Sequence, residues 1–123
     1  MNQCKQLNIN DIKIDGVMIA IDDGSATIED YQGRENEAVP SASGDHSFKS
    51  KRVTPKLKFK RQTSGVYDPS QNTDNENHEI SFRDSDTGRR GRVTRAVVGT
   101  GGTIGNGDSA EETWLLLSKI QWL

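Results

Sequence analysis

Cysteine, aromatic residues and long apolar runs are all scarce in this chain of 123 residues. Its single cysteine, Cys4, cannot form an internal disulfide, and no spacing of Cys and His suits zinc. No apolar run exceeds five residues, whereas a membrane-spanning helix needs ~20. The N-terminal residues lack the apolar core of a secretory signal. We therefore expect no metal site and no membrane partner, and synthesis in a reducing cytoplasm.

Apolar content is low as well. Hydrophobic residues make up 31 % of the chain and aromatic residues 6 %. A monomer of this length buries only about two-thirds of the surface that its unfolded chain exposes. The length suits one domain, residues 1–123, and the lean composition indicates that neighbouring copies supply part of the stability. We expect the protein to work as an assembly.

The net charge is only −2, but the charges are grouped in blocks of alternating sign. Residues 48–66 hold seven bases and no acid, and residues 88–98 hold four arginines and no acid. The segments between and around these blocks are acidic. Such an arrangement suits charge-complementary contacts between copies better than one uniform surface for a polyanion.

Apolar residues recur at every second position between short runs of Gly, Asn, Asp and Ser, which is typical of an all-β, mainly antiparallel domain. Asp15-Gly16 and Asp86-Thr87-Gly88 predict hairpin turns. The clearest strand is 49–61, where Leu57 and Phe59 share an apolar face and lysines occupy the other. Pro55 cannot donate to a sheet ladder, so this strand is expected at an edge or with a bulge.

Three other segments leave alternatives open. Residues 33–47 predict a long polar loop, either ordered by a partner or simply a surface loop. Residues 65–77 predict a second loop, with a short helix starting near Asp68 as one option. Residues 114–123 carry apolar residues on both faces, with Trp114 and Trp122 on the same one. This indicates a strand sandwiched between layers or subunits, or else a buried helix.

The sequence contains no motif or residue pair that supports an enzymatic function. The glycine run 99–107 lacks the strand, helix and lysine context of a phosphate-binding loop. His46 and His78 lie in polar segments and are expected to be solvated. Adjacent acids such as Glu111 and Glu112 point to opposite faces of a strand and cannot act as an acid–base pair. We expect no catalytic residues and no cofactor.

The basic segment 49–61 has two interpretations. Its lysines can track a phosphate backbone, as in a small OB-like barrel that binds nucleic acid. Such sites interleave aromatic residues, but Phe59 is the only aromatic among these lysines, and it is expected on the apolar face. Ion pairing with acids of a neighbouring subunit is the better supported interpretation.

Several stretches together resemble one known family. They are the hairpins with Asp15-Gly16-Val17 and Asp23-Gly24, the loop from Arg34-Glu35-Asn36-Glu37 into Phe48-Lys49 and Thr54-Pro55-Lys56-Leu57, and the hairpin Phe82–Arg89. In order and size they resemble the tail tube proteins of contractile-tailed (myovirus) bacteriophages, most closely the short Mu-like type. The resemblance covers most of the chain, which departs from the family in lacking a strong helix.

This resemblance implies a small β-sandwich or barrel with a flanking helix, six copies of which form a ring. Stacked rings form a tube in the virion tail, assembled in the host cytoplasm. The tube encloses the tape-measure protein and the DNA ejected into the host, and the tail sheath wraps it. A baseplate and a tail terminator close its ends, and its lumen is acidic. A terminator or tube-initiating ring protein is the related alternative.

By the same resemblance, the loop 33–47 reaches the neighbouring ring, and the basic strand lies at subunit contacts or toward the sheath. Lys56→Glu with Lys58→Glu is then expected to weaken assembly without unfolding the monomer. The candidate residues at subunit or ring contacts are Arg34, Glu35, Glu37, Lys49, Lys51, Arg52, Lys56, Lys58, Lys60, Arg89, Arg90, Trp114 and Trp122.

Overall fold

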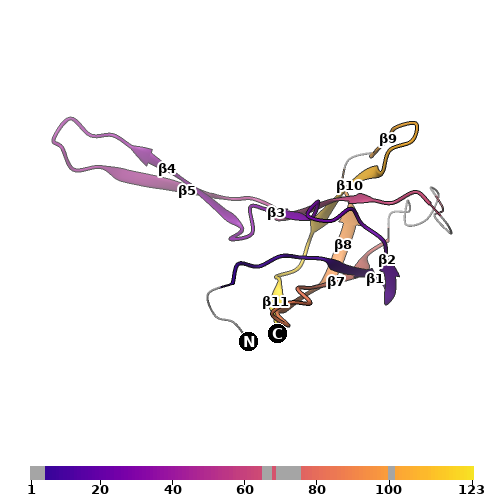
Figure 1. Ribbon diagram of the computed structural model, residues 1–123. Helices are drawn as coiled ribbons and strands as arrows, with labels where there is room; N and C mark the ends of the chain where they lie inside the picture. Colours follow the sequence, from indigo (N-terminus) through magenta and orange to yellow (C-terminus); the bar gives the residue numbers. More distant parts are fainter. Residues whose placement is uncertain (1–4, 65–67, 69–75, 100–101) are drawn as a thin grey trace.

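A computed structural model describes residues 5–64, 68, 76–99 and 102–123, and these residues form strands, turns and connections without a helix (Figure 1). The strands are β1 Asp11–Ile14, β2 Val17–Ile19, β3 Thr27–Glu29, β4 Arg34–Val39, β5 Ser47–Arg52, β6 Lys56–Arg61, β7 His78–Arg83, β8 Arg90–Val98, β9 Thr103–Ile104, β10 Ala110–Leu116 and β11 Gln121–Trp122. The all-β expectation is confirmed. The optional helix near Asp68 falls on 65–77, of which only 68, 76 and 77 are described. Within the described part, no helix is long and apolar enough to cross a membrane.

The main sheet is antiparallel throughout and curls into a small barrel. Its strand order is β2-β1-β7-β8-β10-β6-β3, with β9 added to β10 and β11 added to β8. The chain after β2 returns to the other end of this order, because Ile21 bridges Arg61. The amide of Asp22 donates to the Lys60 carbonyl at 2.9 Å, and the amide of Gln62 donates to the Ala20 carbonyl at 2.8 Å. These bonds join β6 to the continuation of β2 and close the barrel.

Two of the expected turns are present. Asp15 and Gly16 connect β1 to β2 with φ of 51° and 81°. Both central residues of a type I′ turn need such left-handed values, which Asp tolerates and Gly adopts without strain. The Asp86-Thr87-Gly88 turn lies between β7 and β8, with Gly88 at φ 76°.

The core fills the inside of the barrel. Leu57 and Phe59 point inward from β6, as their spacing predicts, and Trp114 from β10 is completely buried beside them. β1, β7 and β8 supply further isoleucine, phenylalanine and valine side chains. The alternation of buried and exposed residues along β6 and β7 follows from a strand with one face in the barrel and one in water.

The prediction of one strand over 49–61 is wrong. β5 ends at Arg52, and β6 begins at Lys56 between β10 and β3, so β6 is not an edge strand. The break coincides with Pro55, which has no amide proton but whose carbonyl accepts a bond from the Leu116 amide at 2.9 Å. At this break the chain passes from β5, which pairs with β4 outside the main sheet, into the barrel.

The prediction of a loop over 33–47 is also wrong. Residues 34–39 pair with 47–52 as the antiparallel hairpin β4–β5, and only 40–46 connect the two strands. Figure 1 shows this hairpin extending away from the barrel as a separate two-stranded sheet. The alternation rule missed it because neither of its faces is buried in the chain.

The C-terminal segment forms two strands rather than a helix. β10 ends at Leu116, and β11 adds Gln121 and Trp122 to β8. The face with Trp114 and Leu116 is buried, but Leu117 and Leu123 on the other face are 42 % and 68 % exposed. The sandwiching layer expected over this second face is absent from the described residues.

Candidate interaction surface

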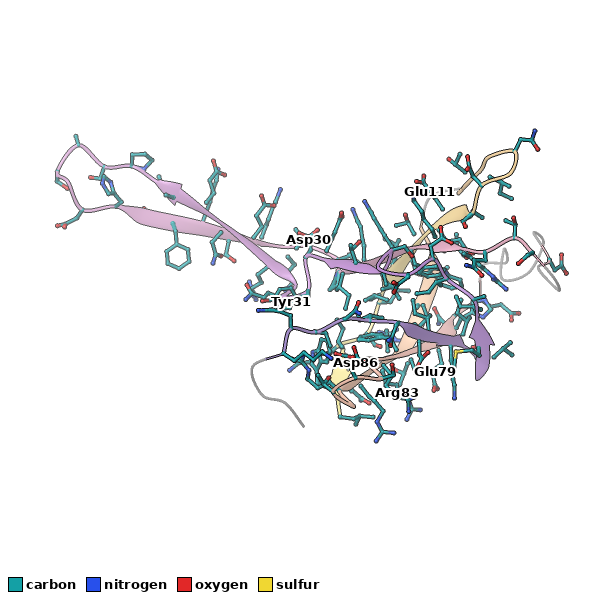
Figure 2. All side chains as sticks on the ribbon, in the orientation of Figure 1. Asp30, Tyr31, Glu79, Arg83, Asp86 and Glu111 are labelled. Atoms are coloured by element: carbon teal, nitrogen blue, oxygen red, sulfur yellow. The ribbon has the colours of Figure 1, made fainter. Side chains whose placement is uncertain are left out.

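The β4–β5 hairpin is the most unusual surface of the molecule. All twelve residues of its two strands are exposed. The hairpin is held at its base, where the Val53 amide donates to the Gly33 carbonyl at 3.1 Å and the Gly33 amide to the Asp30 carbonyl at 2.9 Å. Asp30 and Tyr31 lie at this base (Figure 2). An isolated two-stranded hairpin is only marginally stable in water, so a surface that covered this one would stabilise it.

On one face of the hairpin, lysines and glutamates of the two strands form ion pairs with each other. Lys49 Nζ lies 3.5 Å from Glu37 Oε2, and Lys51 Nζ lies 3.4 Å from Glu35 Oε2. These pairs join residues directly opposite each other in the register. Exposed pairs of this kind contribute at most about 1 kcal/mol each. They nevertheless give these lysines acidic partners within their own chain.

The other face carries an exposed aromatic residue and two arginines without acidic partners among the described residues. Phe48 lies opposite Ala38 and is 70 % exposed, and Arg34 lies directly opposite Arg52 at the base. Like charges at opposed positions destabilise a strand pair. Arg34 Nη1 donates to Ser50 Oγ at 3.4 Å, and neither arginine forms an ion pair with the described residues. This face combines an exposed aromatic residue with two available cations.

The lysines of β6 lie on the outside of the barrel beside β3. Lys58 Nζ lies 3.1 Å from Glu29 Oε1, and Lys56 is opposite Glu29 in the register. Lys60 is exposed. Reversing the charge of Lys56 and Lys58 would therefore also place new carboxylates beside Glu29, within the chain.

Trp114 is a correction to the predicted contact set. Its side chain has no exposed surface, and its Nε1 donates to Glu112 Oε1 at 3.3 Å. It belongs to the barrel core because β10 lies between β6 and β8 and turns this position inward. Trp122, in contrast, is half exposed and packs edge to face on Phe82, with ring centroids 5.5 Å apart.

Arg89 and Arg90 flank the start of β8. Arg89 donates from Nε to Thr87 Oγ1 at 3.2 Å and from Nη2 to the Lys5 carbonyl at 3.1 Å, so its side chain fastens the N-terminal segment to this turn. Arg90 is exposed. The structure does not bring either arginine together with the hairpin.

Asp84, which no predicted site included, is fully buried at the turn between β7 and β8. Its carboxylate accepts bonds from the Asn8 amide at 3.1 Å, the Thr87 hydroxyl at 2.9 Å and the Asp86 amide at 2.9 Å. Burial alone would raise the pKa of Asp84, but these hydrogen bonds outweigh it and lower the pKa from its usual 3.8. The Asp-Ser-Asp-Thr-Gly sequence is the available signal, because Asp commonly accepts bonds from turn amides.

The two histidines differ. His46 is exposed, as expected, and its Nδ1 accepts a bond from the Ser41 amide at 3.1 Å. His78 was expected to be solvated but is 8 % exposed. Its Nδ1 contacts Asp15 Oδ2, and its ring lies edge to face on Trp114 at 5.7 Å. No local signal marks this burial, because Asp15 is 63 residues away in sequence.

The adjacent acids on β10 behave as the alternation predicts. Glu111 points outward (Figure 2), whereas Glu112 points inward, with Oε2 3.8 Å from Arg61 Nη1. Among the described residues, no cluster of three or more His, Cys, Asp or Glu side chains forms a candidate metal site.

Comparison with known proteins adds no family to these observations. No protein-family model matches the chain, and no curated protein sequence matches it. The barrel and its projecting hairpin are therefore the structural features that bear on function.

Proposed function

We propose that this chain is a structural subunit of a phage-type tail tube. In this role, copies associate side by side into hexameric rings, and the rings stack into a conduit through which DNA passes into a host. A contractile sheath surrounds the tube, and the tape-measure protein occupies its lumen. The proposal joins the family resemblance in the sequence to one structural observation, the hairpin.

The projecting β4–β5 hairpin is the observation that carries the proposal. The β4–β5 hairpin takes no part in closing the barrel, because it forms a separate sheet. Every residue of its two strands is exposed in the single chain. Ordering it costs conformational entropy that its own few contacts do not offset. A copy of the same chain is an available covering surface, and repeated contacts between copies are what a tube requires.

Nucleic-acid binding is the second candidate, favoured by the hairpin face that carries Phe48, Arg34 and Arg52. An aromatic platform beside cations is the usual arrangement for binding single strands. Against it, Lys49, Lys51 and Lys58 already have carboxylates within 3.5 Å, and Phe59 is buried.

Sedimentation velocity over a concentration series separates these candidates. A tube subunit is expected to form large species above a critical concentration, without added nucleic acid. A binding module would stay monomeric and bind a labelled single-stranded oligonucleotide, with log affinity falling linearly in log salt concentration. Monomers at every concentration together with salt-dependent oligonucleotide binding would overturn the tube proposal.

A further inference from the structure

A groove lies at the base of the hairpin, between the hairpin and the C-terminal residues. It has a volume of about 770 Å³, and Tyr31, Pro55, Leu117 and Trp122 contribute its apolar lining. Tyr31, Leu117 and Trp122 are 61 %, 42 % and 50 % exposed. The volume is within the ~300–1,000 Å³ typical of pockets that hold a ligand. It has room for more than one side chain.

The charged residues at the groove are all of one sign. Arg52 and Lys119 line it, and no acid does. Neither cation forms an ion pair with the described part of the chain. The groove therefore suits an occupant with an apolar side chain and a nearby carboxylate.

The hairpin of the same chain cannot be this occupant. Arg52 is both the last residue of β5 and part of the groove lining, so the groove adjoins the base of the hairpin. Six extended residues span ~20 Å, and the hairpin extends away from the barrel (Figure 1). Its outer end lies far from its own groove and is available to another copy.

The outer end of the hairpin carries apolar side chains and a carboxylate, which are complementary to the apolar, cationic groove. Phe48 and Ala38 form the apolar part of one face, and Val39, on the opposite face, is 40 % exposed. The connection 40–46 carries Asp45 and no lysine or arginine. Asp45 is exposed and forms no ion pair with the described residues.

We infer that the outer end of one copy's hairpin docks in the groove of another copy, with Phe48 against Leu117 and Trp122 and with Asp45 near the cationic rim. The inference rests on the proposed function and supplies its contact. Because hairpin end and groove are different surfaces, each copy offers one of each. Such a head-to-tail contact propagates into rings or open helical arrays rather than stopping at a dimer.

Photo-crosslinking tests the contact directly. A benzophenone amino acid is placed at position 48, or at the control position 17, which is also an exposed strand position. After irradiation, the linked peptides are identified by mass spectrometry. We expect position 48 to link to a peptide of residues 116–123 on a second copy, and position 17 to give no such product.

A complementation experiment tests its directionality. Phe48→Ser disables the hairpin end, and Leu117→Glu disables the groove by adding a carboxylate to its apolar lining. At the concentration where the wild type begins to assemble, each variant alone is expected to remain monomeric, and an equimolar mixture to form 1:1 dimers through the one intact contact. Circular dichroism and urea unfolding test whether both variants fold, which we expect because both side chains are exposed.

The outcomes distinguish this inference from the tube proposal. Tubes whose position 48 links to another hairpin, or a Leu117→Glu variant that assembles like the wild type, would overturn the inference and leave the tube proposal standing. A link from 48 to 116–123 in closed rings that never stack would support the inference and overturn the tube. A monomer with no crosslink at any concentration would overturn both.

Discussion

Replacing Phe48 by serine separates the contribution of the hairpin to assembly from its contribution to folding. Full burial of a phenylalanine side chain contributes about 1.5–3 kcal/mol. Because Phe48 is 70 % exposed in the single chain, covering it in an assembly contributes about 1–2 kcal/mol per contact on the same scale. A tenfold change in a binding constant corresponds to about 1.4 kcal/mol, so the critical concentration should rise by about 5- to 30-fold.

The same substitution should leave the fold intact. Surface substitutions away from special features change the free energy of unfolding by less than about 0.5 kcal/mol. Sedimentation or light scattering against protein concentration measures the critical concentration for assembly. Urea unfolding of the monomer measures the free energy of unfolding. Val17→Ser is the matched control, since Val17 is 54 % exposed on a strand outside the hairpin. Assembly of Phe48→Ser at the wild-type concentration, or an equal shift for Val17→Ser, would refute the reasoning.

Three further predictions concern the barrel. Trp114→Ala should lower the free energy of unfolding by about 3–5 kcal/mol in urea titrations, because it empties a fully buried site; a loss below about 1 kcal/mol would contradict its core position. Gly91→Ala should lower it by about 1–3 kcal/mol, since an added Cβ would lie 2.4 Å from the buried Phe82 ring; an unchanged urea midpoint would show that this ring moves freely. The lowered pKa of Asp84 means that its contribution is present above about pH 4 and is lost as the pH falls through its folded-state value. Asp84→Asn should therefore be less stable at pH 7 and lose less stability than wild type below pH 4, and identical thermal unfolding profiles against pH would contradict this.

The antiparallel strands were predictable from sequence because their signals are local. Asp15-Gly16 is a turn sequence whose φ values the structure confirms, and Leu57 and Phe59 alternate with lysines because one face of β6 is buried. Such two-residue periodicity needs only one face in the core. Closure of the sheet through Ile21 and Arg61 joins residues 40 positions apart, which no local pattern reports.

The hairpin was missed for the opposite reason. With no buried face, β4 has no apolar alternation, so its hydropathy pattern is that of a polar loop. The available signal was charge register. Glu35 and Glu37 occur at alternate positions, as do Lys49 and Lys51, and the register places them opposite each other.

Trp114 shows how an apolar run can mislead. Its neighbours on both strand faces are apolar, which suggested a layer on each side. Only the inner face is fully buried, whereas Leu115 on the outer face is half-buried and Leu117 is exposed. The exposed Leu117 belongs instead to the groove beside Trp122. The outer apolar residues thus mark a surface that the single chain leaves uncovered.

Negative-stain electron microscopy of the purified protein over a concentration series tests the central claim most directly. The account predicts stacked rings or tubes of uniform diameter above a critical concentration, and their loss at the same concentration for Phe48→Ser. Particles of monomer size at every concentration, for the wild type and the variant alike, would contradict it.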